Sequence, residues 1–92
     1  VEDNIDYPVE FLDPIKCIPI VTPVMIPSIN EFFERICIVT QIYNQGTNPY
    51  TREPLTLEIL EKHNAKEDVT KKINEFIEKK KRWIEEYNTK NK

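Results

Sequence analysis

The chain has 92 residues, of which 39% are hydrophobic and 32% charged, and its net charge is −3. A chain of this length forms one small domain that buries only about 60–65% of its unfolded surface, so a deep catalytic cavity is not expected. Residues 1–34 hold seven acidic residues and one lysine, whereas residues 35–92 hold twelve basic and nine acidic residues. An acidic chain without a clustered basic groove argues against nucleic acid as its partner.

The cysteine content and the hydropathy of the sequence limit the cellular compartments in which the chain is expected. Cys17 and Cys37 are the only cysteines, and neither a signal peptide nor an apolar run of membrane-spanning length is present. These features predict reduced, half-buried thiols, no membrane association, and residence in the cytoplasm or nucleus. The chain begins at Val1 without a methionine, which predicts a piece of a longer protein.

The first third of the chain favours loops and a hairpin. Residues 1–9 are acidic and offer few apolar anchors, Tyr7 among them, so we expect a tail. Four prolines exclude a helix from about residue 12 to 28. The β-branched residues in this region predict a short strand at 24–26, and residues 30–33 are expected to form the return strand.

Residues 35–44 combine features of strand and helix. Their β-branched content favours a strand, but apolar residues recur at spacings of three and four, as on the wide face of a helix. Glu31 and Glu34 near the start suit the positive end of a helix dipole, and Gly46 suits a helix stop. We therefore predict a buried helix over residues 35–44.

A rigid loop follows at residues 48–56. Pro49 and Pro54 fix the backbone φ angle and remove two donors, and Tyr50 and Arg52 stand between them. A rigid loop that displays an aromatic ring and an arginine often forms a binding surface, because little entropy is lost on docking. From the loop alone, an ordinary connector between two helices is an equally good interpretation.

Two helices are expected after this loop. Thr56 predicts the cap of a short helix that His63 and Asn64 end, and Asp68 predicts the cap of the last helix. Apolar residues at helical spacing continue through residues 69–77, so this part should pack on the domain.

The basic run at residues 79–82 interrupts the apolar stripe of the last helix. Such a run is most often a solvated face. We expect the helix to project from residue 78 onward, leaving Trp83, Ile84 and Tyr87 free for a partner helix or a homodimer.

The sequence has few residues of the kinds that carry out catalysis or bind a metal. His63 is the only histidine, and no Cys-His pair, glycine-rich phosphate loop or close carboxylate pair stands out. Cys17, Cys37 and His63 are too few and too scattered for structural zinc, which takes four ligands. The sequence predicts no metal and no cofactor, and a binding module is the default interpretation.

Four short motifs stand in order along about residues 10–57. They are EFLDPI at 10–15, TPVMIPS at 22–28, Glu34-Arg35, and NPYTREPLT at 48–56. Together they resemble a U-box, the zinc-free relative of the RING domain found in ubiquitin ligases, and most of all its ubiquitin chain-elongation subclass.

The resemblance implies an α+β fold, in which two loops flank a short β-hairpin and a central helix, and a C-terminal helix follows. It divides the chain into an acidic tail at 1–9, a U-box domain at 10–78 and a basic helical extension at 79–92. The resemblance also implies a ubiquitin-protein ligase that docks a ubiquitin-conjugating enzyme charged with ubiquitin. Such a ligase needs no covalent intermediate, and the protein substrate would bind other parts of the parent protein.

The same resemblance implies which residues carry the site. Ile15 in the first loop and Pro49 in the second match the apolar contacts of the docking groove. Cys17 and Tyr50 lie beside them and are expected to contribute. Arg52 matches the arginine that bridges the conjugating enzyme and its thioester-linked ubiquitin, and is the candidate catalytic residue.

Three positions depart from the family pattern. Thr22 stands where an Asp is usual, Glu34 where an Asp usually precedes Arg, and Asn48 where an Asp is common. Those acidic groups belong to the polar network that replaces zinc in the family, so we expect a weakened or rewired network here. The alternative is a degenerate U-box that acts as a non-catalytic interaction or dimerisation module.

Overall fold

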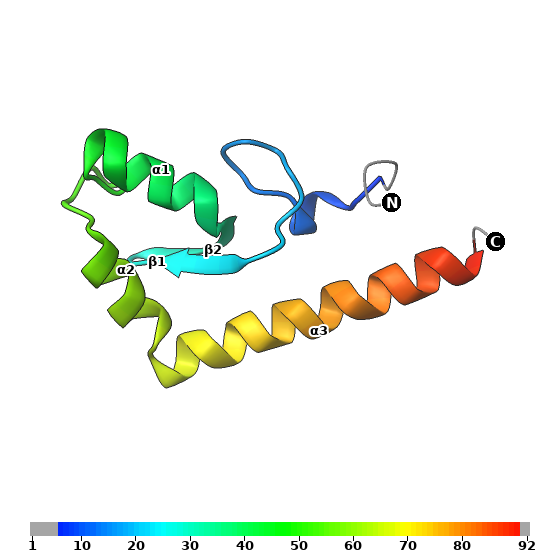
Figure 1. Cartoon of the computed structure of the whole chain (residues 1–92). Coiled ribbons are helices and arrows are strands. Elements are labelled where there is room, and N and C mark those ends of the chain that lie inside the picture. Colours follow the sequence, from blue (N-terminus) through cyan, green and yellow to red (C-terminus); the bar gives the residue numbers. More distant parts are fainter. Residues whose placement is uncertain (1–5, 91–92) are drawn as a thin grey trace.

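A computed structural model of the chain describes residues 6–90. Its elements confirm an α+β fold, arranged as a hairpin that three helices surround (Figure 1). In chain order they are the short 3-10 helix η2 (Val9–Phe11), β1 (Pro23–Ile26), β2 (Ile29–Glu34), α1 (Arg35–Gln45), α2 (Leu57–Asn64) and α3 (Glu67–Lys90).

The hairpin forms where the sequence predicts it. β1 and β2 pair antiparallel, with an irregularity of register between Val24 and Ile26. The amide of Asn64, at the end of α2, bonds both the N–H and the C=O of Met25 at 2.8 Å. A side chain therefore satisfies the backbone of Met25 and ties α2 to the hairpin.

The first core lies between the hairpin, α1 and α2. Its buried members are Val24, Ile26, Phe33, Ile38, Leu55 and Leu60. Val39 and Ile42 pack against this cluster from the same helix as Ile38. The spacing of three and four therefore identified α1 correctly, although β-branched content favours a strand.

The ends of the helices follow local capping chemistry. Gly46 closes α1 with a left-handed φ of 66°, and the Thr56 hydroxyl caps α2 by accepting the N–H of Ile59 at 3.1 Å, as predicted. The prediction for Asp68 was wrong, because α3 begins at Glu67 and places Asp68 inside its first turn. There its charge still suits the helix dipole.

A second core joins the start of the chain to α3, and it overturns two expectations. Tyr7, expected in a tail, is buried with Phe11, Ile20 and Phe76, and Trp83 and Ile84 pack against this cluster. The rings of Tyr7 and Trp83 lie 5.2 Å apart. The helix therefore does not project free from residue 78, because the first described residues cover its apolar side chains.

Polar contacts of the basic run reinforce this packing. Lys79 pairs with Glu10 at 2.9 Å, and the Lys80 ammonium donates to the C=O of Ile20 at 2.6 Å and lies over the Tyr7 ring. Two of the four basic side chains thus hold the start of the chain on α3. The division of the chain after residues 9 and 78 stays a prediction, and residues 1–5 lie outside the described part.

Both cysteines are free thiols, with Cys17 exposed instead of half-buried and Cys37 partly buried. Within residues 6–90, no helix combines the length and the apolar character that crossing a membrane requires.

Candidate functional site

Backbone hydrogen bonds of its first residue close the first candidate loop, Asp13–Ile18. The N–H of Asp13 donates to the C=O of Ile18, and the C=O of Asp13 accepts from the N–H of Cys17, both at 2.7 Å. One carboxylate oxygen, Oδ1, accepts from the N–H groups of Ile15 and Lys16 at 2.8 Å each. Asp13 is fully buried, whereas the Ile15 side chain is 40% exposed. The buried carboxylate therefore holds an apolar side chain out toward solvent.

The second candidate loop, Asn48–Glu53, is closed in the same manner. The N–H of Asn48 donates to the C=O of Glu53 at 2.8 Å, and its C=O accepts from the N–H of Arg52 at 2.9 Å. The amide oxygen of Asn48 accepts from the N–H groups of Tyr50 and Thr51 at 2.8 and 3.2 Å. Asn48 is 3% exposed and Tyr50 is 46% exposed.

Strand β2 brings the two loops together. The second carboxylate oxygen of Asp13 accepts the N–H of Glu34 at 2.8 Å. The Tyr50 ring meets Phe33 edge-to-face, with centroids 5.7 Å apart. Phe33 and Glu34 are consecutive, so the first loop and the Tyr50 ring of the second loop contact neighbouring residues of β2. The second loop is also bonded to the hairpin turn, where the Asn48 side chain donates to the C=O of Pro27 at 3.1 Å.

Residues 22 and 34, where the sequence departs from the family pattern, take part in polar contacts between the segment after the first loop and the start of α1. The Glu34 carboxylate accepts the N–H groups of Val21 and Thr22 at 3.1 and 2.7 Å. The C=O of Thr22 accepts the N–H of Arg35 at 2.9 Å. The carboxylate of Glu34 therefore reaches back to the exit of the first loop, and Thr22 takes part through its backbone.

Burial and nearby carboxylates raise the pKa values of two groups near the loops, Tyr50 and Cys37. Burial, and then the Glu31 carboxylate, raise the pKa of the Tyr50 hydroxyl above its usual 10.0. Burial, followed by the charges of Asp13 and Glu34, raises the pKa of the Cys37 thiol. A raised pKa leaves less of the Cys37 thiol as thiolate, which makes it a weaker nucleophile.

Arg52 ends the second loop in an unusual backbone conformation. Its φ is 67°, in the left-handed region, and the equivalent residue of the first loop, Cys17, has φ 56°. Among residues 6–90 the guanidinium of Arg52 has no hydrogen bond and no ion pair, and the residue is exposed. Ile15, Cys17 and Tyr50 are likewise exposed, and Pro49 is half-buried. The roles assigned to these residues stay predictions.

The sequence did not identify Asp13 and Asn48, whose side chains hold the two loops, as parts of the site. Asp13 counts in the sequence as one acidic residue among seven, and Asn48 only as a departure from a family pattern. The available signal was the Asp-Pro and Asn-Pro pair that opens each loop, since Asp and Asn side chains commonly bond the backbone two and three residues on.

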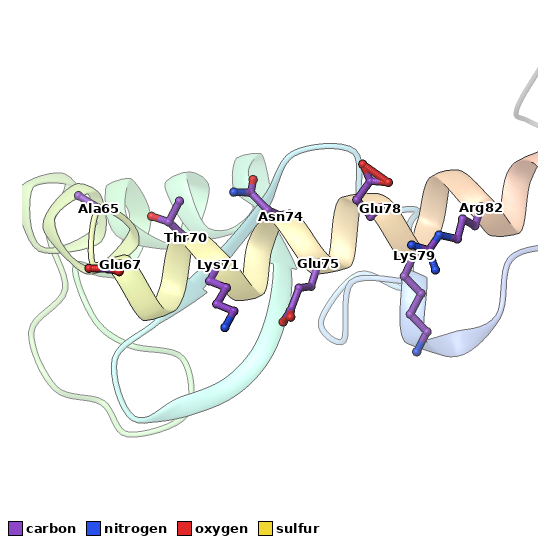
Figure 2. A pocket seen from close by; sticks show the side chains of 9 residues that line it. All are labelled: Ala65, Glu67, Thr70, Lys71, Asn74, Glu75, Glu78, Lys79 and Arg82. Atoms are coloured by element: carbon purple, nitrogen blue, oxygen red, sulfur yellow. The ribbon is translucent and has the colours of Figure 1, made fainter.

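The broad hollow along α3 is not a competing site. Figure 2 shows its side chains spread along one helix face, where acidic and basic groups are interspersed. Ala65 is its one lining residue outside α3. No group of three or more His, Cys, Asp or Glu residues in the described part of the chain could hold a metal ion.

Comparison with known proteins agrees with this geometry. The chain matches the U-box domain over residues 7–82. It therefore belongs to the U-box family, a class associated with ubiquitin ligation. The match begins at Tyr7, the residue that anchors the start of the chain on α3.

A similar curated protein is the ubiquitin conjugation factor E4 A of Pongo abelii. The two are 32% identical over 77 residues, which cover 84% of this chain. The chain spans only 6% of the length of that relative.

Proposed function

We propose that this domain docks a ubiquitin-conjugating enzyme charged with ubiquitin and promotes transfer of the ubiquitin from its thioester to a substrate or growing chain. One observation carries the proposal. Two loops with the same hydrogen-bonded closure are both attached to the hairpin and leave Ile15 and Tyr50 partly exposed, and both reach neighbouring residues of β2, Glu34 and Phe33. The membership in the U-box family and the name of the curated relative support it.

Docking would use the apolar side chains of both loops. Ile15 and Tyr50 are partly exposed while their backbones are fixed by buried side chains, so docking orders little that is not already ordered. Pro49 adds a rigid contact in the second loop and Cys17 a small one in the first. Such a shallow surface suits a folded protein partner.

Arg52 would act on the docked conjugate. A guanidinium offers five donors in a rigid fork and can bond the backbones of two proteins at once. Because the Arg52 side chain is not engaged within residues 6–90, it is available for this purpose. Restricting a mobile thioester-linked ubiquitin to geometries open to lysine attack lowers the entropic part of the barrier, so the ligase needs no nucleophile.

The direct test is Arg52→Ala in a discharge assay with a panel of charged conjugating enzymes. Loss of charge-assisted hydrogen bonds worth about 1.5–3 kcal/mol should slow discharge about 10- to 100-fold, with the fold retained. Alanine and arginine both carry a Cβ, so the backbone cost of the left-handed φ hardly changes. Arg52→Lys keeps the charge without the fork and should recover little. Equal discharge by Arg52→Ala and the wild type would rule out the assigned role.

Docking is tested separately with Ile15→Ala in a chemical-shift titration. Loss of a half-exposed isoleucine contact should weaken binding about 5- to 20-fold. Ile77→Ala, a similarly exposed isoleucine on α3, is the matched control and should bind as the wild type does. If both variants bind equally well, the groove lies elsewhere. Absence of autoubiquitination with every conjugating enzyme would favour the non-catalytic module.

A further inference from the structure

Glu31 stands on β2 between the places where the two loops are attached to the hairpin. The first loop is bonded to the end of β2, where the N–H of Glu34 donates to the Asp13 carboxylate at 2.8 Å. The second loop is bonded to the turn before β2, where the Asn48 amide donates to the C=O of Pro27 at 3.1 Å. Glu31 belongs to the part of the strand that separates these two attachments.

The side chain of Glu31 reaches both loops. It lines a hollow beside the first loop together with Pro14 and Cys17. Side chains alternate along a strand, so Glu31 shares a face of β2 with Phe33, the residue on which the Tyr50 ring of the second loop rests. The Glu31 carboxylate is close enough to the Tyr50 hydroxyl to raise its pKa. A partner that touches both loops therefore also meets Glu31.

The charge of Glu31 is not neutralised by the chain, unlike the acidic side chains around it. Glu10, in the same hollow, pairs with Lys79 at 2.9 Å. The Asp13 carboxylate accepts three backbone N–H groups, and the Glu34 carboxylate accepts two. Glu31 is exposed, and within residues 6–90 it forms no ion pair.

Covering an unpaired carboxylate costs free energy unless the partner supplies a cation. A partner with an apolar or acidic side chain at this place is therefore disfavoured, and one with a lysine or arginine is favoured. We propose that Glu31 determines which conjugating enzymes dock, by favouring those that present a lysine or arginine between the two loops. This inference rests on the proposed function and adds the chemistry of the partner that the site accepts.

The first test is a binding titration with a panel of conjugating enzymes at low and high salt. For the enzymes that the wild type binds best, Glu31→Gln should weaken binding about 3- to 5-fold and Glu31→Lys more than about 10-fold at about 0.01 M salt. Both losses should shrink at about 1 M salt, because exposed charges are screened. Glu86→Gln and Glu86→Lys make the same changes at an exposed glutamate on α3 and should bind as the wild type does.

The second test exchanges the charges between the two proteins. Each exposed lysine and arginine on the docking face of a bound conjugating enzyme is changed to glutamate in turn. One of these variants should lose binding to the wild-type domain and regain it with Glu31→Lys, but not with Glu86→Lys. Failure of every variant to regain binding would overturn the proposed contact.

The variant Tyr50→Phe separates direct recognition of a cation from an effect on the Tyr50 ring. Direct recognition requires that Glu31→Gln weakens binding by the same factor with and without the Tyr50 hydroxyl. Disappearance of the effect in the Tyr50→Phe background would overturn the inference, as would wild-type affinity of Glu31→Lys for the whole panel. In these cases the wild type still docks and the proposed function stands. If the wild type binds no conjugating enzyme, the proposed function and this inference both fail.

Discussion

Replacing Trp83 with alanine tests whether the C-terminal half of α3 belongs to the folded core. The Trp83 ring lies 5.2 Å from that of Tyr7 and 6.0 Å from that of Phe11, and Tyr87 stacks on it at 5.2 Å. Truncating a fully buried tryptophan costs about 3–5 kcal/mol. Since Trp83 is only half-buried, we expect the free energy of unfolding to fall by about 2 kcal/mol.

Equilibrium unfolding in urea measures this loss, followed by far-ultraviolet circular dichroism because Trp83 is the only tryptophan. With a slope of about 1–2 kcal/mol per molar, the midpoint should fall by about 1–2 M. Tyr43→Ala is the matched control, since this ring on α1 is 73% exposed and its removal should cost no more than about 0.5 kcal/mol. An equally small loss in both variants would refute the packing of α3 on the start of the chain.

Three smaller perturbations test other features. Thr56→Ala removes the cap of α2 and should lower the free energy of unfolding in urea by about 1 kcal/mol; no loss would mean that the cap contributes nothing. Gly46→Ala has room for its Cβ but must adopt a φ of 66°, so a similar loss of about 1 kcal/mol is expected from backbone strain alone. Cys37 should alkylate more slowly than Cys17 at about pH 8, because its raised pKa leaves less thiolate, and mass spectrometry should find the difference gone in denaturant. Equal rates in the folded protein would contradict the burial of Cys37.

Local chemistry explains what the sequence predicts well. The hairpin, α1 and the cap of α2 depend on spacings and side chains within a few residues of one another. The segment of α1 is helical despite its β-branched content, because a helix buries Ile38 in the core formed with the hairpin and α2. The order of motifs then predicted the two loops and their neighbourhood.

Long-range pairing explains what the sequence could not show. Tyr7 and Trp83 are separated by most of the chain, and no periodicity indicates that the first covers the second. The burial of Asp13 is equally hidden, because its partners are backbone N–H groups that every sequence contains. Only the Asx-Pro pair that opens each loop marks the two loops as related. Which backbone group of the hairpin bonds each loop, an N–H or a C=O, can be seen only in the folded chain.

The contact between Tyr7 and Trp83 also sets how the fold would respond to tension. The two ends of the described chain lie at the same end of the molecule (Figure 1). A force applied to both ends would therefore act on the aromatic contacts before it acts on the rest of the domain. The second loop is attached to the hairpin through Pro27 and takes no part in this cluster. Tyr7 and Trp83 would therefore be among the first contacts to open under such a force.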